Sequence, residues 1–263
     1  MRHPLVNIAT RAATAAGNII VRYTNRLDNL SVSEKQRNDF VTEVDRAAEK
    51  EIIYTLQKAY PQYAVLAEES GHVDARSKGD SEGEWIVDPL DGTSNFIHGL
   101  PHYCVSIAFR ERGRITQGVI FDPVRNELFV ASAGAGAFCN DNRMRVTDQR
   151  ELDRCLLATG LPYRNRDRAD SYFEMLRKSF DASEDIRRGG SAALDLAYVA
   201  AGRIDGYWEM GLQPWDMAAG ALMVREAGGT VLDFKGGENY LHSGDIIATS
   251  ARLAPKLTRT LMT

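Results

Sequence analysis

The sequence predicts a mixed α/β protein, with an α+β first half followed by an α/β second half. Up to about residue 150, two amphipathic stretches precede short apolar runs separated by turn residues, the pattern of helices followed by an antiparallel sheet. Beyond residue 150, apolar runs alternate with stretches of helical periodicity. We therefore expect an α+β subdomain over residues 1–150 and an α/β subdomain over residues 151–263.

The composition is that of a globular protein with an ample core. Of 263 residues, 44% are apolar and 26% are charged, which excludes a disordered or coiled-coil chain. The net charge of −4 provides no overall attraction for nucleic acid or for an anionic membrane. No apolar stretch approaches the roughly 18 residues of a membrane span, and the N-terminus lacks the apolar core of a signal peptide. The three cysteines, at positions 104, 139 and 155, lack metal or disulfide spacing, so we expect buried free thiols and a cytoplasmic protein.

Two helices are predicted near the N-terminus. From Pro4 to about residue 30, apolar side chains recur at three- and four-residue steps, and proline suits a first helical turn. A second helix is expected from Thr42, because the residues up to Asp45 have the spacing of a helix cap and apolar periodicity continues until Pro61. Asp45 therefore lies in a first helical turn.

Strands are predicted from short apolar runs. In the first half these runs cover residues 64–67, 84–87, 105–110, 118–121, 127–131 and 137–139, with hairpin turns at Arg112-Gly113 and at residues 140–142. In the second half we expect strands at 156–159, 186–188, 205–210, 230–234 and 245–249. The helices between and after them are expected at 171–180, 191–201, 216–227 and the C-terminus.

Acidic residues stand where three of the apolar runs end, at residues 67–70, 88–93 and 213–217. The middle segment is the most informative. Pro89 restricts φ and removes a donor, while Gly92 permits a turn that other residues resist. Asp88 and Asp91 can therefore converge on one point, with the carbonyl of Leu90 beside them.

Carboxylates without a histidine or thiolate nearby form the oxygen donor set that Mg²⁺ or Mn²⁺ prefers over zinc. Their mutual repulsion raises their pKa values unless a cation compensates. Each acid alone also has an ordinary structural interpretation: a turn residue, a helix cap for Asp45, or a first-turn helix acid for Asp216. Because adjacent side chains of an extended chain point in opposite directions, only one of Glu68 and Glu69 should face the site.

Other polar residues have weaker functional signals. The five histidines lack metal-ligand spacing, which favours surface or packing roles. Ser191 is not in the Gly-x-Ser-x-Gly turn of a serine nucleophile. The glycines at 134 and 136 lie between strands and indicate a turn, and the basic residues at 35–37 and at Arg187-Arg188 are typical of solvated faces.

In combination, these motifs resemble the Mg²⁺-dependent inositol monophosphatase family. The similarity extends over nearly the whole chain and is most specific at Glu-Glu-Ser (68–70), Asp-Pro-Leu-Asp-Gly-Thr (88–93) and Trp-Asp-Met-Ala-Ala-Gly (215–220), with further similar stretches at 38–45 and 190–198. The resemblance implies a layered α-β-α-β-α sandwich. It also implies a lithium-sensitive phosphomonoesterase that hydrolyses inositol 1-phosphate and similar polyol monophosphates with metal-activated water.

The resemblance assigns roles to individual positions. Glu68, Asp88 and the Leu90 carbonyl would hold one Mg²⁺, while Asp88, Asp91 and Asp216 would hold a second, and Asp45 would lie near a weaker third ion linked to Glu68. Catalysis would rest on Glu68, Asp88 and Thr93, of which Thr93 helps to activate the attacking water. The expected substrate contacts are Asp91, Gly92, Thr93, Ser191, Ala192 and Glu209.

Three further expectations follow from the same resemblance. The main alternative is a related phosphatase acting on 3′-phosphoadenosine 5′-phosphate or fructose 1,6-bisphosphate. Some bacterial members of the family are also associated with antitermination on ribosomal RNA operons together with RNA polymerase and Nus factors, and Arg187 and Arg188 are our candidate contacts for that role. The family is typically dimeric, so we expect a homodimer.

Overall fold

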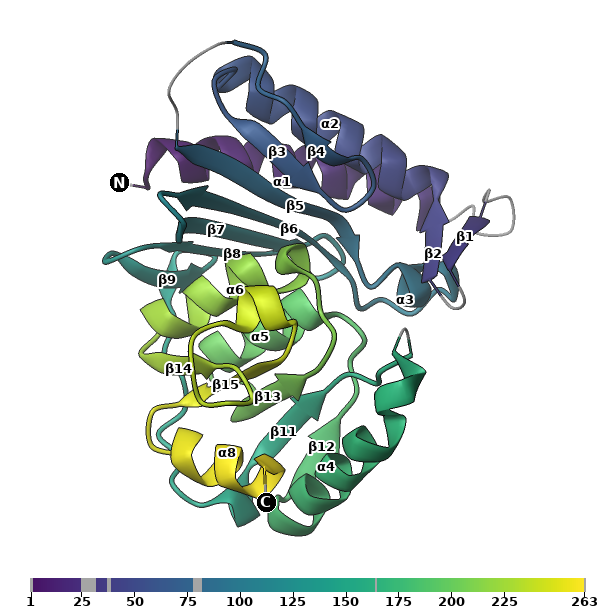
Figure 1. Ribbon diagram of the computed structural model, residues 1–263. Helices are drawn as coiled ribbons and strands as arrows, with labels where there is room; N and C mark the ends of the chain where they lie inside the picture. Colours follow the sequence, from purple (N-terminus) through teal and green to yellow (C-terminus); the bar gives the residue numbers. More distant parts are fainter. Residues whose placement is uncertain (1, 25–31, 37–38, 78–81, 164, 263) are drawn as a thin grey trace.

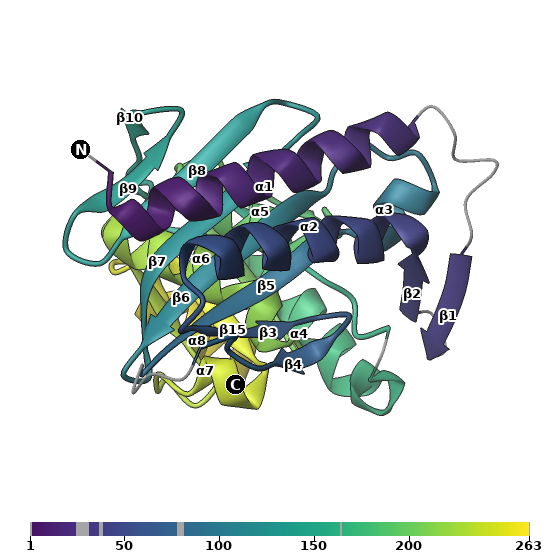
Figure 2. The same ribbon diagram turned by 90° about the horizontal axis from the view of Figure 1, so that it is seen from above.

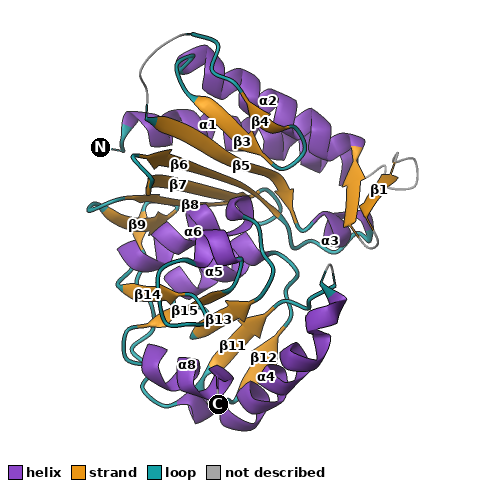
Figure 3. Cartoon of the chain, viewed as in Figure 1, coloured by secondary structure: helices purple, strands orange, loops and turns teal. Residues whose placement is uncertain are grey.

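The computed structural model describes residues 2–24, 32–36, 39–77, 82–163 and 165–262, and it has five layers. In Figure 1 a layer of helices is followed by the eight-stranded sheet, a central layer of helices, the five-stranded sheet and an outer layer of helices. Figure 3 distinguishes the same layers by type of secondary structure. The layered α-β-α-β-α arrangement expected from the sequence is therefore confirmed.

The outer helices α1 (Pro4–Tyr23) and α2 (Glu43–Ala59) lie side by side on the outer face of the eight-stranded sheet, as Figure 2 shows from above. Helix α2 begins as predicted. The Thr42 side chain accepts hydrogen bonds from the backbone N–H groups of Val44 and Asp45, and the Asp45 carboxylate accepts the Thr42 N–H in return. This reciprocal cap fixes the direction of the Asp45 side chain.

The eight-stranded sheet has the order β10-β9-β8-β7-β6-β5-β3-β4. All neighbouring pairs are antiparallel except β3 and β5, which are parallel. The predicted turns are present, since Arg112, Gly113, Asn140 and Asp141 all have the positive φ of tight hairpins. The strands are β3 (Ala64–Ala67), β4 (Gly71–Val73), β5 (Gly83–Asp91), β6 (Cys104–Glu111), β7 (Arg114–Asp122), β8 (Glu127–Ser132), β9 (Gly136–Cys139) and β10 (Asn142–Arg143).

The five-stranded sheet has the order β12-β11-β13-β15-β14. Strand β11 is parallel to both neighbours, whereas the β13–β15 and β15–β14 pairs are antiparallel. Helices α4 (Ala169–Ala182) and α8 (Ala254–Met262) lie on its outer face. The strands are β11 (Leu156–Thr159), β12 (Asp185–Arg187), β13 (Gly206–Glu209), β14 (Gly229–Leu232) and β15 (Ile246–Ser250).

Successive residues of a central strand contribute to different cores, because side chains alternate between the two faces of a sheet. Ile86 belongs to the core between the sheets, whereas Trp85 and Val87 pack under α1 and α2. In the second sheet Ala248 faces inward and Ile247 packs towards α4 and α8. Both sheets are thus covered on both faces, which is why their strands read as continuous apolar runs.

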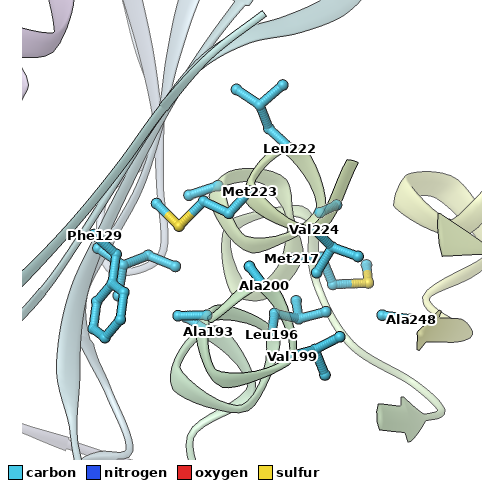
Figure 4. Close-up of a cluster of buried hydrophobic side chains, with 14 of the residues drawn as sticks. Phe129, Ala193, Leu196, Val199, Ala200, Met217, Leu222, Met223, Val224 and Ala248 are labelled. Atoms are coloured by element: carbon cyan, nitrogen blue, oxygen red, sulfur yellow. The ribbon is translucent and has the colours of Figure 1, made fainter. Parts of the chain in front are cut away.

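The central layer consists of α5 (Ala192–Ala200) and α6 (Pro214–Glu226), which are apolar around almost their whole circumference. Figure 4 shows their side chains packed between the sheets, with Leu196 and Met217 inside the layer and Phe129 and Ala248 from the flanking strands. A helix that is apolar on every side must be buried on every side. The N-termini of both helices carry the polar residues of the site described below.

Some predicted boundaries were wrong. Helix α1 ends at Tyr23 and not near residue 30, and residues 25–31 lie outside the described part of the chain. Cys104 and Cys155 are buried free thiols as expected, but Cys139 is only half-buried. Short elements escaped prediction: β1 (Val32–Gln36), β2 (Asp39–Thr42), β4, β10, α3 (Thr93–Ile97), α7 (Tyr240–Ser243) and the 3₁₀ turns Leu152–Arg154 and Arg166–Arg168. Among the described residues, no helix has the length and apolarity needed to cross a membrane.

Candidate functional site

A cavity of about 420 Å³ contains most of the residues singled out in the sequence. Residues from both halves of the chain line it, so neither sheet forms it alone. Its acidic end consists of Glu68, Asp88, Asp91 and Asp216. Its remaining lining includes Leu90, Gly92, Thr93, Ser94, His98, Gly160, Tyr163, Arg188, Gly190, Ala192, Glu209 and Leu212.

The end of β5 brings Asp88 and Asp91 to the same side of the cavity. The pairing of β5 with β6 is irregular between these two residues, as expected where Pro89 cannot donate a ladder hydrogen bond. Asp88 Oδ1 accepts the N–H of Leu90 at 2.9 Å, which closes a tight local turn. Gly92 follows with φ +98°, and a Cβ there would lie 2.9 Å from the His102 carbonyl oxygen.

Residues at the N-terminus of α5 bind the Asp91 carboxylate. Asp91 Oδ2 accepts the Ser191 hydroxyl at 2.6 Å and the Ala193 N–H at 2.7 Å. Ser191 is 1% exposed and does not line the cavity. The Ser191 hydroxyl is thus directed to the Asp91 carboxylate, and the substrate contact that we expected of Ser191 stays a prediction.

Asp216 comes from the first turn of α6. Its Oδ2 accepts the N–H of Gln213 at 2.7 Å, so Asp216 completes a helix cap. The Ser106 hydroxyl of β6 donates to the Trp215 carbonyl at 3.3 Å, which ties this turn to the eight-stranded sheet. Asp216 therefore has the helix-terminal role considered in the sequence analysis, and it also lines the cavity.

Three carboxylates converge although they are far apart in sequence. One oxygen from each of Asp88, Asp91 and Asp216 lies within 4.8 Å of the other two, close enough to share a cation. Burial raises the pKa of Asp88 well above its usual range, and the neighbouring charges of Glu68, Asp91 and Asp216 raise it further. A cation would relieve this repulsion, and the donor set contains only oxygen, as Mg²⁺ requires.

Only one of the two adjacent glutamates faces the cavity, as expected. Glu68 lines it, whereas Glu69 does not. Glu68 follows β3, and its N–H donates to the carbonyl of Val87 at 3.1 Å, which continues the parallel pairing of β3 with β5. The parallel register therefore places Glu68 next to Asp88, the residue that follows Val87.

Asp45 and Thr93 form a hydrogen-bonded pair beside the carboxylates. The Thr93 hydroxyl lies 2.9 Å from both Asp45 Oδ1 and the Leu90 carbonyl oxygen. Asp45 is fully buried, and its Oδ2 accepts the N–H and the hydroxyl of Thr42. Burial raises the pKa of Asp45 despite these hydrogen bonds. Asp45 is thus a helix cap and a partner of Thr93 at once.

Glu209, from the end of β13, also lines the cavity. Tyr207 donates a hydrogen bond to this carboxylate, which lies so close to Gly160 that a Cβ there would be 2.0 Å away from it. Ala192, the first residue of α5, lines the cavity as well. The Glu209 carboxylate and this backbone surface are suited to polar, uncharged groups.

Sequence reasoning missed several residues of the cavity. Arg188 and His98 are exposed, as their assignment to a solvated face and to a surface or packing role predicted, but they also line the cavity together with Tyr163. None of them stands in a motif, so no local signal distinguishes them. Asp195, a buried carboxylate on α5 that does not line the cavity, was also missed, and burial together with the charge of Glu209 raises its pKa well above the usual range.

The chain is similar to known proteins over nearly its whole length. Nus factor SuhB of Escherichia coli K12 is 52% identical over 251 residues, which cover 95% of this chain and 93% of that protein. The crystal structure of extragenic suppressor protein suhB from Bartonella henselae superimposes with a TM-score of 0.95 at 47% identity and covers 98% of each chain. An inositol monophosphatase from Anabaena (Nostoc) has a TM-score of 0.87 at 39% identity and covers 98% of this chain and 94% of its own. The model of the inositol monophosphatase family matches residues 1–262, and this chain belongs to that family.

Proposed function

We propose that the chain is an Mg²⁺-dependent phosphomonoesterase that hydrolyses inositol 1-phosphate and similar polyol phosphates. The observation that carries the proposal is the convergence of Asp88, Asp91 and Asp216 to within 4.8 Å at one end of a cavity. Three buried or half-buried carboxylates this close repel one another unless cations lie between them. Family membership supports the same chemistry.

The proposed cation ligands are those expected from the family. Glu68, Asp88 and the Leu90 carbonyl form one set, and Asp88, Asp91 and Asp216 form the other, with Asp45 near a weaker third position. When bound, Mg²⁺ supplies activation of water and stabilisation of charge on the transferred phosphoryl group and the leaving oxygen. An acidic protein can thereby accept an anionic substrate.

The residues of the chain orient the attacking water. Because Thr93 donates its proton towards Asp45 Oδ1 at 2.9 Å, a lone pair of Thr93 Oγ1 is left to accept a hydrogen bond from water. As the water attacks phosphorus, its proton passes to Thr93 and the Thr93 proton passes to Asp45. The raised pKa of Asp45 favours this transfer. The new bond joins the water oxygen to phosphorus while the ester P–O bond breaks, the leaving polyol oxygen takes up a proton from solvent, and no phosphoenzyme forms.

The substrate would lie along the cavity. We propose that the phosphate would lie beside Asp91 and accept hydrogen bonds from the amides of Gly92 and Thr93, where α3 begins. The polyol would then lie against Ala192 and donate hydroxyl hydrogen bonds to Glu209, which accepts but cannot donate when ionised. These contacts bind and orient the substrate without taking part in bond breaking.

The test is a phosphate-release panel on the purified full chain, with and without Mg²⁺ and Li⁺. Inositol 1-phosphate, 3′-phosphoadenosine 5′-phosphate and fructose 1,6-bisphosphate compete in one preparation. We expect Mg²⁺-dependent, Li⁺-inhibited release with preference for inositol 1-phosphate. Asp91→Asn should abolish release, while Asp74→Asn, whose side chain is 96% exposed, is the matched control. Near-normal hydrolysis by Asp91→Asn at saturating Mg²⁺ contradicts the assignment, and preference for a bisphosphate favours the alternative substrate class.

We also propose a second role in transcription antitermination, because relatives about half identical to this chain are named Nus factor SuhB. Arg187 is exposed and pairs with Asp185 on the edge strand β12, so it remains our candidate contact, whereas Arg188 lines the cavity. Tagged wild-type protein should retain RNA polymerase in a pull-down from its own cells, and Arg187→Glu should weaken retention. No retention by the wild type contradicts this role.

We propose a homodimer as well, which light scattering tests directly.

A further inference from the structure

Glu49 is a buried carboxylate with no part in the proposed reaction. It lies on α2, one helical turn after Asp45, and is 2% exposed. A carboxylate removed from water persists where protein donors replace the lost hydration. The donors that bind Glu49 therefore indicate what it does.

Both donors belong to the turn immediately after Glu68. Glu49 Oε2 accepts the N–H of Glu69 at 2.8 Å, and Glu49 Oε1 accepts the hydroxyl of Ser70 at 2.5 Å. On its other side, Glu68 donates its own N–H to the Val87 carbonyl of β5 at 3.1 Å. The two peptide groups that flank the Glu68 side chain are thus held by different elements, one by β5 and one by α2.

The same helix also holds the Asp45–Thr93 pair. Asp45 and Glu49 are four residues apart, so both face the same side of α2. Their separation is set by the regular rise of the helix, about 6 Å over four residues. Helix α2 thereby connects the turn that carries Glu68 with the hydroxyl of Thr93.

We propose that Glu49 is a positioning residue that holds Glu68 in the place where Glu68 binds a cation. Its effect is local: Asp88, Asp91 and Asp216 are positioned by β5, α5 and α6, and none of these contacts passes through Glu49. The proposal rests on the cation ligands proposed above, and its kinetic consequences rest on the proposed reaction as well. Loss of a residue that orients a metal ligand typically weakens metal binding about 10- to 100-fold.

The decisive variant is Glu49→Gln, which keeps the size of the side chain but turns an amide nitrogen towards one of the two donors. The metal-free full chain is titrated with Mn²⁺, and the free ion is followed by electron paramagnetic resonance. Glu68→Gln identifies the binding step that depends on Glu68. We expect Glu49→Gln to weaken that step about 10- to 100-fold and to leave the other step within about twofold.

Three comparisons separate positioning from a general loss of structure. Glu51→Gln, on the same helix, should bind Mn²⁺ like the wild type. Ser191→Ala, which releases Asp91, should weaken the other step. Ser70→Ala removes one of the two donors and should weaken the Glu68-dependent step less than Glu49→Gln does. If Glu49→Gln does not fold, Ser70→Ala tests whether the contact with Glu49 supports cation binding. High Mg²⁺ should restore the activity of Glu49→Gln.

Two results overturn the proposal. One is Mn²⁺ binding by Glu49→Gln that matches the wild type at both steps. The other is equal weakening of both steps together with a lower melting temperature, which would make Glu49 a general stabilising residue. If the wild type releases no phosphate from any substrate, the proposed function fails, but the Mn²⁺ titration still decides the role of Glu49.

Discussion

Replacing Ser191 tests whether its hydroxyl positions Asp91 or contacts the substrate. Ser191→Ala removes the 2.6 Å hydrogen bond to Asp91 Oδ2 and the 3.4 Å bond from the Leu194 N–H that caps α5. A hydrogen bond to a charged group contributes about 1.5–3 kcal/mol, and an N-cap contributes about 1 kcal/mol. The Ala193 N–H remains 2.7 Å from Asp91 and retains part of the support. The metal-free variant should lose about 2–4 kcal/mol, which lowers its melting temperature by about 5–15 °C.

Phosphate release then separates two kinetic outcomes. If Ser191 acts through Asp91, the half-saturating Mg²⁺ concentration should rise about tenfold. At saturating Mg²⁺ the KM for inositol 1-phosphate should stay within twofold of the wild type, because no substrate contact has been removed. Ser191→Thr keeps a capping hydroxyl and should restore most of the Mg²⁺ affinity. A raised KM with an unchanged Mg²⁺ requirement and melting temperature would refute the reasoning.

Three other substitutions test the site. Gly92→Ala should lower the melting temperature by at least about 2 °C and should also lower the activity. The reason is that a side chain at φ +98° costs about 1–2 kcal/mol and that the new Cβ lies 2.9 Å from the His102 carbonyl oxygen. Ser94→Ala is the control, and an unchanged melting curve of Gly92→Ala contradicts the argument. Thr93→Val should lower kcat about 10²- to 10⁴-fold while Mn²⁺ binding is retained, and a normal kcat rules out the water-activating role. Burial raises the folded-state pKa of Asp195, so its contribution to stability is present below the unfolded pKa of about 4 and is lost as pH rises through the folded pKa. Asp195→Asn should therefore melt at least about 2 °C above the wild type at pH 8 and not at pH 4, and equal differences at both pH values refute this.

Local features of the chain were predictable because neighbouring residues alone determine them. Thr42 and Asp45 form the expected cap at the start of α2, since a reciprocal cap needs only two suitable residues three positions apart. The turn at Arg112-Gly113 likewise follows from residues that adopt positive φ. The end of α1 was less predictable, because apolar periodicity declines gradually and does not mark the last helical turn.

Contacts between distant segments were decided by the tertiary structure. The sequence identifies Asp88 and Asp91 as a converging pair and indicates a cation, because a proline and a glycine shape the chain between and beside them. It does not indicate that α5 holds Asp91 through Ser191, a contact across 100 positions. Nor does it reveal that Glu49 holds the turn after Glu68, or that Arg188 lines the cavity. Local spacing determines the direction of a side chain relative to its own helix or strand, but only the packing of five layers determines which side chain it meets.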